Sequence, residues 1–236
     1  CYYRDIRKMK RRLTFKGIEE SVAELEKTFA SILFEQGEDI VTQEWLLEKL
    51  NTLRKKIVEQ HNGLFVSLVD ELIGKVLIFG VYFATLDIRQ DSSIHQKLMA
   101  HLSETNNVLP EDYTSLSEDE KIKVLLKVKK QVNEKLLDDE LFKDTFSSIK
   151  TIKAIQERNG EYGCNRYIIS HATSAVDMLE VYALLKMSGW KEEEMSVDIV
   201  PLFETIDDLQ CAGAVMEKMY ANKTYREHLR RRGDTQ

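Results

Sequence analysis

Proline and glycine are scarce in this sequence, with only two prolines and ten glycines among 236 residues. Because these two residues interrupt helices and strands most strongly, their scarcity predicts few irregular loops and much helix. Uninterrupted apolar runs are also short, far below the roughly 20 residues that a membrane-spanning helix needs. A composition of 43% hydrophobic and 31% charged residues is globular. We therefore expect a soluble, predominantly helical protein without a membrane partner.

The chain has little cysteine and no excess of positive charge. Cys1, Cys164 and Cys211 lack the spacing of a metal or redox site, which predicts free thiols in a reducing cytoplasm. A formal net charge of −6 gives no general attraction to nucleic acid. We interpret the basic run at residues 4–12 as a solvated start and not as a nucleic-acid-binding arm. Because position 1 is Cys, we expect the chain to be a piece of a longer protein.

Apolar residues recur at helical spacing through most of the chain. In the first third they predict an antiparallel helical layer made of three helices, at 19–36, 42–60 and 64–79. The apolar stripe is predicted on the second helix at Leu46, Leu50, Leu53 and Ile57, and on the third at Leu64, Leu68, Leu72, Val76 and Phe79. Further helices are expected near 95–102, 118–137, 139–157, 174–185 and 224–232, and one after 205.

Three short runs of β-branched and aromatic residues predict strands at 81–88, 167–172 and 197–203. A helix follows each run, and this alternation indicates a parallel sheet with right-handed crossovers. Before two of these helices a hydroxyl residue is followed three positions later by Asp, which predicts capping boxes and two βα units of one polarity. The fold class is therefore α/β, predominantly helical.

Polar side chains gather where the predicted strands end, at Arg89, Gln90, Ser170, His171 and Glu204. Because the carboxyl ends of parallel strands meet at one edge, we expect these side chains to line one cavity. The planar fork of a guanidinium suits a phosphate or a carboxylate. A lone carboxylate suits Mg²⁺ or Mn²⁺, which fill their remaining positions with water and substrate oxygens. A metal-bound, phosphorylated or dicarboxylate ligand is therefore predicted.

Two of these residues also have a purely structural interpretation. Arg89 could form only a salt bridge, with Glu204 or with Asp87, and have no contact with a ligand. A histidine at a strand end is more often a hydrogen-bonded packing residue than a base. We therefore assign His171 no role.

The blocks around the predicted strand ends resemble the phosphoenolpyruvate carboxylase family. The resemblance is carried, in the family's order and spacing, by LDIRQDSS-x-H (86–95), YIIS (167–170) and VPLFETIDDL (200–209), and more weakly by SEDEKIKVLL (117–126). It is clear from about residue 63 to residue 232, whereas the first sixty residues are less telling.

The resemblance implies a fold and a domain organisation. The family has a (β/α)₈ TIM-type barrel wrapped in extra helices, so this chain would be a partial barrel with about three of the eight strands. We accordingly expect an N-terminal helical layer at 1–62 and a partial barrel segment with flanking helices at 63–236.

The resemblance also implies an activity. The family joins phosphoenolpyruvate and bicarbonate to give oxaloacetate and phosphate, with Mg²⁺ or Mn²⁺, and the parent is expected to be a cytoplasmic homotetramer. Glu204 matches the family's metal-ligand glutamate, and Arg89 matches an arginine that lines the substrate site. His171 departs from the family pattern. The second metal ligand and other catalytic groups would lie outside this chain, so we expect no turnover from the chain alone.

Two other classes of function remain open at this point. One is a helical interaction module without chemistry, which would agree with the high helix content. The other is a different barrel enzyme acting on phosphoenolpyruvate or a dicarboxylate, because such an enzyme could also place an arginine and a glutamate at strand ends.

Overall fold

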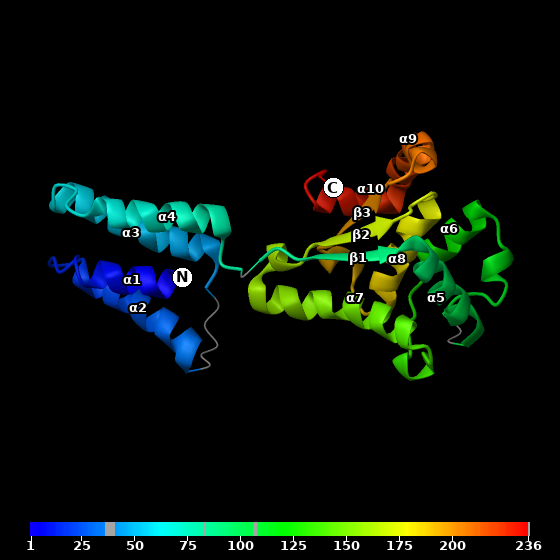
Figure 1. The fold of residues 1–236 in the computed structure, drawn as a ribbon, viewed down its shortest axis with the longest axis horizontal. Coiled ribbons are helices and arrows are strands. Elements are labelled where there is room, and N and C mark those ends of the chain that lie inside the picture. The colour runs from blue at the N-terminus through cyan, green and yellow to red at the C-terminus, as the bar shows by residue number, and fades with distance from the viewer. Residues whose placement is uncertain (36–40, 83, 106–107, 236) are drawn as a thin grey trace. The chain divides into compact units, whose positions relative to one another are not determined.

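The computed structural model describes residues 1–35, 41–82, 84–105 and 108–235, and it divides into two compact units, Cys1–Ala84 and Thr85–Gln236 (Figure 1). Positions 36 and 83, which the sequence places in a predicted helix and a predicted strand, lie outside the described residues. The predicted boundary at 62/63 falls inside the first unit. The fold is α/β with a small parallel sheet, in agreement with the predicted class.

The first unit is helical. Its helices are α1 (Tyr2–Lys10), α2 (Glu19–Phe34), α3 (Gln43–Gln60) and α4 (Val66–Phe79). The three predicted helices are present as α2, α3 and α4, and α3 begins where Thr42 accepts a hydrogen bond from the Trp45 backbone N–H at 3.2 Å. The basic start is not simply solvated, because it forms α1, whose Ile6 and Met9 are buried in the core of the unit.

The buried faces of α3 and α4 agree only in part with the faces predicted from helical periodicity. The stripe predicted on α3 is buried along its whole length: Leu46, Leu50, Leu53 and Ile57. On α4 the predicted stripe is wrong at both ends, because Leu64 and Phe79 are exposed. Val69, Leu72 and Val76 form the buried face instead.

The second unit contains the sheet and most of the helices. In chain order its elements are β1 (Asp87–Asp91), α5 (Ser92–Thr105), α6 (Glu118–Lys127), α7 (Glu140–Asn159), β2 (Arg166–Ser170), α8 (Ala175–Met187), β3 (Asp198–Leu202), α9 (Ile206–Ala221) and α10 (Lys223–Arg231). Single 3₁₀ turns occur at Tyr113–Ser115, Glu134–Leu136, Glu161–Gly163 and Glu192–Glu194.

The three strands are parallel and lie in the order β1-β2-β3, as predicted. The first strand begins later than the predicted 81–88, at Asp87. The reason is the pairing register: Asp87 lies opposite Arg166, the first residue of β2, and a 3₁₀ turn precedes β2. The apolar residues before Asp87 therefore have no strand beside them to pair with.

Helices cover one face of the sheet. Tyr167, Ile169 and Ile199 on this face are buried in the core of the unit. The helix α8 contacts α5, α6, α7 and β3, and every residue of α8 except Lys186 is buried. No helix in the described ranges is long and apolar enough to cross a membrane.

Helix α6 ends earlier than its apolar pattern predicts, at Lys127 and not at residue 137. Beyond Lys127 the backbone becomes extended, and the Val132 N–H donates to the carbonyl of Met187 at 3.1 Å. Lys186 donates to the carbonyl of Leu126 at 2.9 Å. Contacts with the end of α8 thus replace the continued helix.

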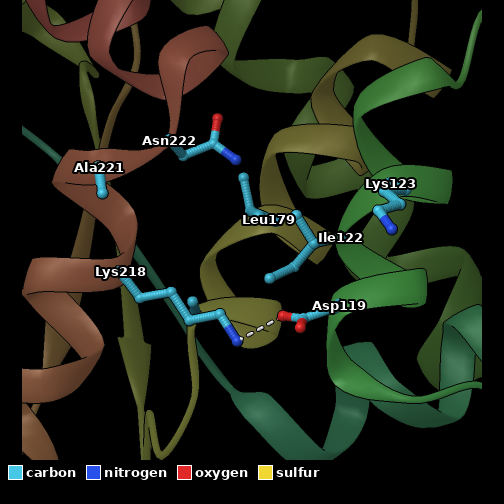
Figure 2. Close-up of a pocket in the computed structure, with 8 residues that line it drawn as sticks. Asp119, Ile122, Lys123, Leu179, Lys218, Ala221 and Asn222 are labelled. Carbon is cyan, nitrogen blue, oxygen red and sulfur yellow. Dashed lines mark ion pairs between the residues drawn. The ribbon is translucent and has the colours of Figure 1, made fainter.

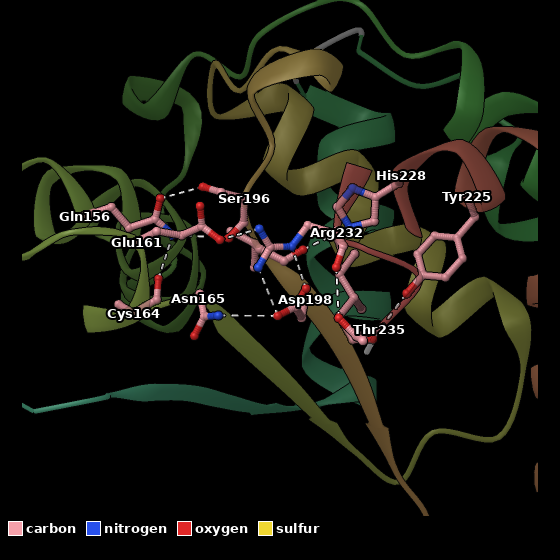
Figure 3. A network of polar contacts seen from close by, with 12 residues as sticks. Gln156, Glu161, Cys164, Asn165, Ser196, Asp198, Tyr225, His228, Arg232 and Thr235 are labelled. Carbon is pink, nitrogen blue, oxygen red and sulfur yellow. Dashed lines mark hydrogen bonds and ion pairs between the residues drawn. The ribbon is translucent and has the colours of Figure 1, made fainter. Parts of the chain in front are cut away.

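At the amino ends of the strands, α10 is tied to β3 (Figure 3). Arg232 donates from Nε and Nη2 to the two Asp198 carboxylate oxygens, at 2.6 and 3.1 Å, and also pairs with Glu161. The side chains of Arg232 and Asp198 are only 12% and 15% exposed. Arg232, just beyond the end of α10, thus forms a two-pronged bond to the sheet.

Two side chains of α10 itself donate to backbone carbonyls, one in β3 and one in the residue just before it. The Tyr225 hydroxyl donates to Ile199 at 3.3 Å, and His228 Nε2 donates to Val197 at 3.0 Å. Burial lowers the pKa of His228 to about 4, so its ring is neutral and can be held by a carbonyl.

We predict that Asp198→Ala lowers the free energy of unfolding by roughly 2–3 kcal/mol, because it leaves a largely buried guanidinium without its main acceptor. Urea unfolding followed by circular dichroism measures this change. The matched control is Arg226→Ala, which removes an exposed contact of 3.9 Å to Asp234 and should cost less than about 0.5 kcal/mol. Equal losses in the two variants would contradict the structural role of the Asp198–Arg232 pair.

Candidate active site at the carboxyl ends of the strands

The pairing register brings the three strand ends to one edge of the sheet. Asp91, Ser170 and Leu202, the last residues of β1, β2 and β3, lie side by side. Adjacent strands are about 4.8 Å apart, so side chains just beyond these residues can meet. His171 follows the central strand, and Glu204 follows β3 at the start of α9.

Arg89 and Glu204 meet at this edge. Arg89 Nη2 donates to Glu204 Oε1 at 2.6 Å, and the two side chains are 53% and 34% exposed. The pair joins β1 to the segment after β3, so it spans the central strand between them. The predicted meeting of a guanidinium and a carboxylate is confirmed. The pair also has the form of the structural alternative, but a salt bridge this exposed stabilises a fold by only about 0–1 kcal/mol.

The backbone around Glu204 is fixed by the capping box of α9. The Glu204 and Thr205 N–H groups both donate to Asp208 Oδ2, at 3.1 and 3.0 Å, and the Asp208 N–H donates to Thr205 Oγ1 at 3.1 Å. The hydrogen bond from the Thr205 backbone is the main reason that the pKa of Asp208 lies below its usual range. The capping pair predicted from sequence thus holds Glu204 in place.

The same construction occurs one βα unit earlier. Asp177 Oδ2 accepts hydrogen bonds from the Thr173 and Ser174 N–H groups, both at 2.9 Å. Its other oxygen accepts from Gln96 of α5 at 2.8 Å. The predicted pair of βα units with capping boxes is therefore confirmed.

Gln90, which was expected at the same edge, is on the other face of the sheet. Its side-chain amide donates to Thr145 Oγ1 of α7 at 3.2 Å. Successive strand residues point to opposite faces, so Gln90 cannot accompany Arg89. Ser170 is also inaccessible, because it is only 7% exposed. Of the predicted group, Arg89, His171 and Glu204 remain accessible.

Asp91 is a member of this group that the sequence analysis missed. Its Oδ2 lies 2.7 Å from His171 Nδ1, and its Oδ1 accepts from the Ser93 N–H at 2.9 Å. Hydrogen bonds from Ser93 hold the pKa of Asp91 below its usual range, and the hydrogen bond to Asp91 raises the pKa of His171. The available signal was spacing, because Asp91 lies two residues after Arg89 and so shares its face of the strand.

His95, the histidine of the LDIRQDSS-x-H block, is not part of the site. It is buried, its Nε2 lies 2.9 Å from the Tyr167 hydroxyl, and burial lowers its pKa to about 4. His95 is therefore a neutral, hydrogen-bonded residue of the core.

Across the described residues, no group of three or more His, Cys, Asp or Glu side chains is arranged to hold a metal ion. Glu204 is a partly exposed carboxylate at the strand-end edge. It therefore fits a divalent cation as one oxygen donor, which agrees with the habit of Mg²⁺ to take one or two carboxylates and keep water in its other positions.

A separate pocket of about 290 Å³ lies among α6, α8 and α9 (Figure 2). Lys218 lines the pocket and pairs with Asp119 at 2.9 Å and with Glu118 at 3.0 Å. Arg89, His171 and Glu204 do not line this pocket, so it is distinct from the strand-end site.

A guanidinium, an imidazole and a carboxylate at the carboxyl edge of a parallel sheet are laid out as in α/β enzymes that bind ligands at strand ends. The sequence model of the phosphoenolpyruvate carboxylase family matches residues 1–236, and the chain belongs to that family.

Curated relatives support the same assignment. The phosphoenolpyruvate carboxylase of Synechocystis sp. is 33% identical over 196 residues, which cover 80% of this chain and 19% of the relative. That of Prochlorococcus marinus (strain MIT 9301) is 37% identical over 178 residues, 71% of this chain and 18% of the relative. The chain thus spans about a fifth of the length of the curated relatives that it matches.

We predict that His171 takes up its proton above pH 6.5, the ordinary value, whereas His95 stays neutral down to about pH 4. The folded pKa of His171 is raised, so its ion pair with Asp91 is complete below pH 6.5 and is lost as the pH rises through the folded value. Histidine NMR titration of the chain measures both rings. Asp91→Asn should return His171 toward 6.5, and an unchanged value would contradict the pairing.

Proposed function

We propose that this chain is part of the active site of a phosphoenolpyruvate carboxylase, which carboxylates phosphoenolpyruvate with bicarbonate to give oxaloacetate and phosphate. Family membership supports the reaction. The observation that carries the proposal is the Arg89–Glu204 contact of 2.6 Å over the carboxyl end of the central strand. It supports the proposal because a guanidinium suits a phosphate or a carboxylate, and the carboxylate beside it suits a divalent cation.

In this proposal Arg89 binds the anionic substrate. Its side chain is 53% exposed, and the guanidinium can present two parallel N–H donors to a phosphoryl or carboxyl group. Because Arg89 lies on β1, pairing with Ile168 of β2 fixes the position of its Cα. The binding group is therefore anchored on a rigid element and only its side chain needs to move.

Glu204 supplies one ligand for Mg²⁺ or Mn²⁺. The capping box of α9 fixes its backbone, so the carboxylate is presented at a defined place. When bound, the cation supplies charge stabilisation for the enolate oxygen that develops during carboxylation.

The ion pair between Arg89 and Glu204 suits a site in which each side chain changes its binding partner when ligands bind. An exposed salt bridge contributes about 0–1 kcal/mol, so separating the two side chains costs little. Each then finds a stronger partner, Arg89 in a substrate oxyanion and Glu204 in a divalent cation. The pair keeps both charges matched while the ligands are absent.

The fold of the intact protein is proposed to be a (β/α)₈ barrel, to which this chain contributes three strands. All-parallel sheets occur almost only with both faces covered. Here the helices cover one face, whereas Ile168, Val200 and Leu202 on the other face are only partly buried. A barrel, with helices outside and this face inside, would complete the burial. The cytoplasmic homotetramer expected for the family belongs to the same proposal.

The test is Arg89→Ala in a full-length carboxylase that carries this segment, assayed by coupling oxaloacetate formation to malate dehydrogenase. We expect kcat/KM for phosphoenolpyruvate to fall by roughly 10³-fold or more, because the guanidinium contacts charge that is redistributed in the transition state.

The matched control is Arg166→Ala. Arg166 also pairs with a neighbouring strand's carboxylate, Asp87, at 2.9 Å, but at the amino end of the sheet. Arg166→Ala should leave kcat/KM for phosphoenolpyruvate within about threefold of the wild-type value, as surface substitutions away from the site usually do. Similar small losses in both variants, with a similar drop in stability, would show that Arg89 is only a structural partner of Glu204.

A further inference from the structure

His171 is held in a backbone conformation that side chains other than glycine rarely adopt. Its φ is 52°, in the left-handed region, where few non-glycine residues are found. The Ser92 hydroxyl donates to its carbonyl at 2.8 Å, and Asp91 binds its ring. Such conformations persist where the surroundings over-determine them, and they cluster at functional sites.

The position of His171 is central in the site. It directly follows Ser170, the last residue of the middle strand, which is paired with Asp91 on one side and with Leu202 on the other. The ion pair of Arg89 and Glu204 joins the two outer strands of the same sheet. His171 therefore lies between the two strands that provide the proposed substrate-binding and metal-binding groups.

Asp91 leaves one ring nitrogen of His171 available. The Nδ1 atom is 2.7 Å from Asp91 Oδ2, whereas Nε2 has no hydrogen-bond partner among the described residues. The side chain is 56% exposed. A carboxylate that fixes one nitrogen of an imidazole and presents the other outward is the usual arrangement for a histidine that acts on a ligand.

The charges that face His171 come from the ends of the two outer strands. Asp91 is the last residue of β1, and Glu204 and Asp208 belong to the segment after β3; all three carboxylates favour the protonated ring. With Glu204 engaged by a cation and Asp208 by the backbone of its capping box, the ring would retain Asp91 as its own counter-ion.

We propose that His171 is a second anion-binding residue of this site, whose Nε2–H donates to an anionic oxygen of phosphoenolpyruvate or of bicarbonate. Asp91 is its positioning residue. This rests on the proposed function and adds to Arg89 a donor from the neighbouring strand. Two donors based on adjacent strands can hold one anion in a fixed orientation, or hold the two anionic substrates side by side.

The test is His171→Asn in a full-length carboxylase that carries this segment. Asparagine tolerates the left-handed conformation, so the backbone is kept while the cationic donor is lost. We expect KM for one anionic substrate to rise about 10-fold, the effect of one charge-assisted hydrogen bond, with kcat changed by less than about threefold. A rise for phosphoenolpyruvate or for bicarbonate identifies which anion the ring holds.

His171→Gly is the second variant and separates binding from backbone strain. Glycine adopts the left-handed conformation freely, so a purely conformational role would leave KM at the wild-type value, whereas the loss of a donor raises KM as in His171→Asn. Asp91→Asn should raise the same KM by a smaller factor, because the ring remains but is less firmly held.

The outcomes distinguish this proposal from the one on which it rests. If Arg89→Ala abolishes turnover but both His171 variants keep KM for each substrate within twofold of wild type, the role of His171 is refuted and the proposed function stands. A wild-type protein that does not carboxylate phosphoenolpyruvate refutes both.

Discussion

The candidate site depends on one constraint, the in-register parallel pairing of three short strands. Pairing places Asp91, Ser170 and Leu202 side by side, and the candidate residues Arg89, His171 and Glu204 all lie within two residues of that line. A shift of β1 by one residue would turn Arg89 to the helix-covered face, because side chains alternate along a strand. Buried Tyr167 and Ile169 oppose such a shift in β2, since it would expose both.

The two ends of the sheet use charge differently. At the amino end, Arg232 and Asp198 are largely buried, doubly hydrogen-bonded and tie α10 to β3. At the carboxyl end, Arg89 and Glu204 are well exposed and joined by a single contact. Since exposed pairs contribute little to stability and buried ones are costly to break, the first arrangement is suited to structure and the second to exchanging ligands.

Much of this layout could be predicted from local sequence, because the signals are chemical and short in range. The predicted capping boxes at Ser174 and Thr205 are present, and so are the parallel strands and the meeting of Arg89 with Glu204. The predicted element boundaries were wrong where a residue far away in the sequence determines where the element begins or ends. The start of β1 is set by Arg166 on β2, and α6 stops early because its continuation binds the end of α8.

The Asp91–His171 pair shows the same limit at the site itself. The residues are far apart in the chain, and only the register of β1 and β2 brings their side chains to 2.7 Å. The left-handed backbone of His171 has only a weak sequence signal, because histidine is enriched at positive φ among non-glycine residues but seldom adopts it. The sequence could therefore offer His171 as a strand-end residue but could not provide its partner.

The central claim is that one edge of this sheet holds a metal and an anionic substrate together, through Glu204 and Arg89. Mn²⁺ binding to a full-length carboxylase that carries this segment, measured by electron paramagnetic resonance with and without phosphoenolpyruvate, tests it most directly. We expect phosphoenolpyruvate to tighten Mn²⁺ binding in wild type, Glu204→Gln to weaken Mn²⁺ binding, and Arg89→Ala to keep Mn²⁺ binding but lose the tightening. Full tightening in Arg89→Ala, or unchanged Mn²⁺ affinity in Glu204→Gln, would contradict the account.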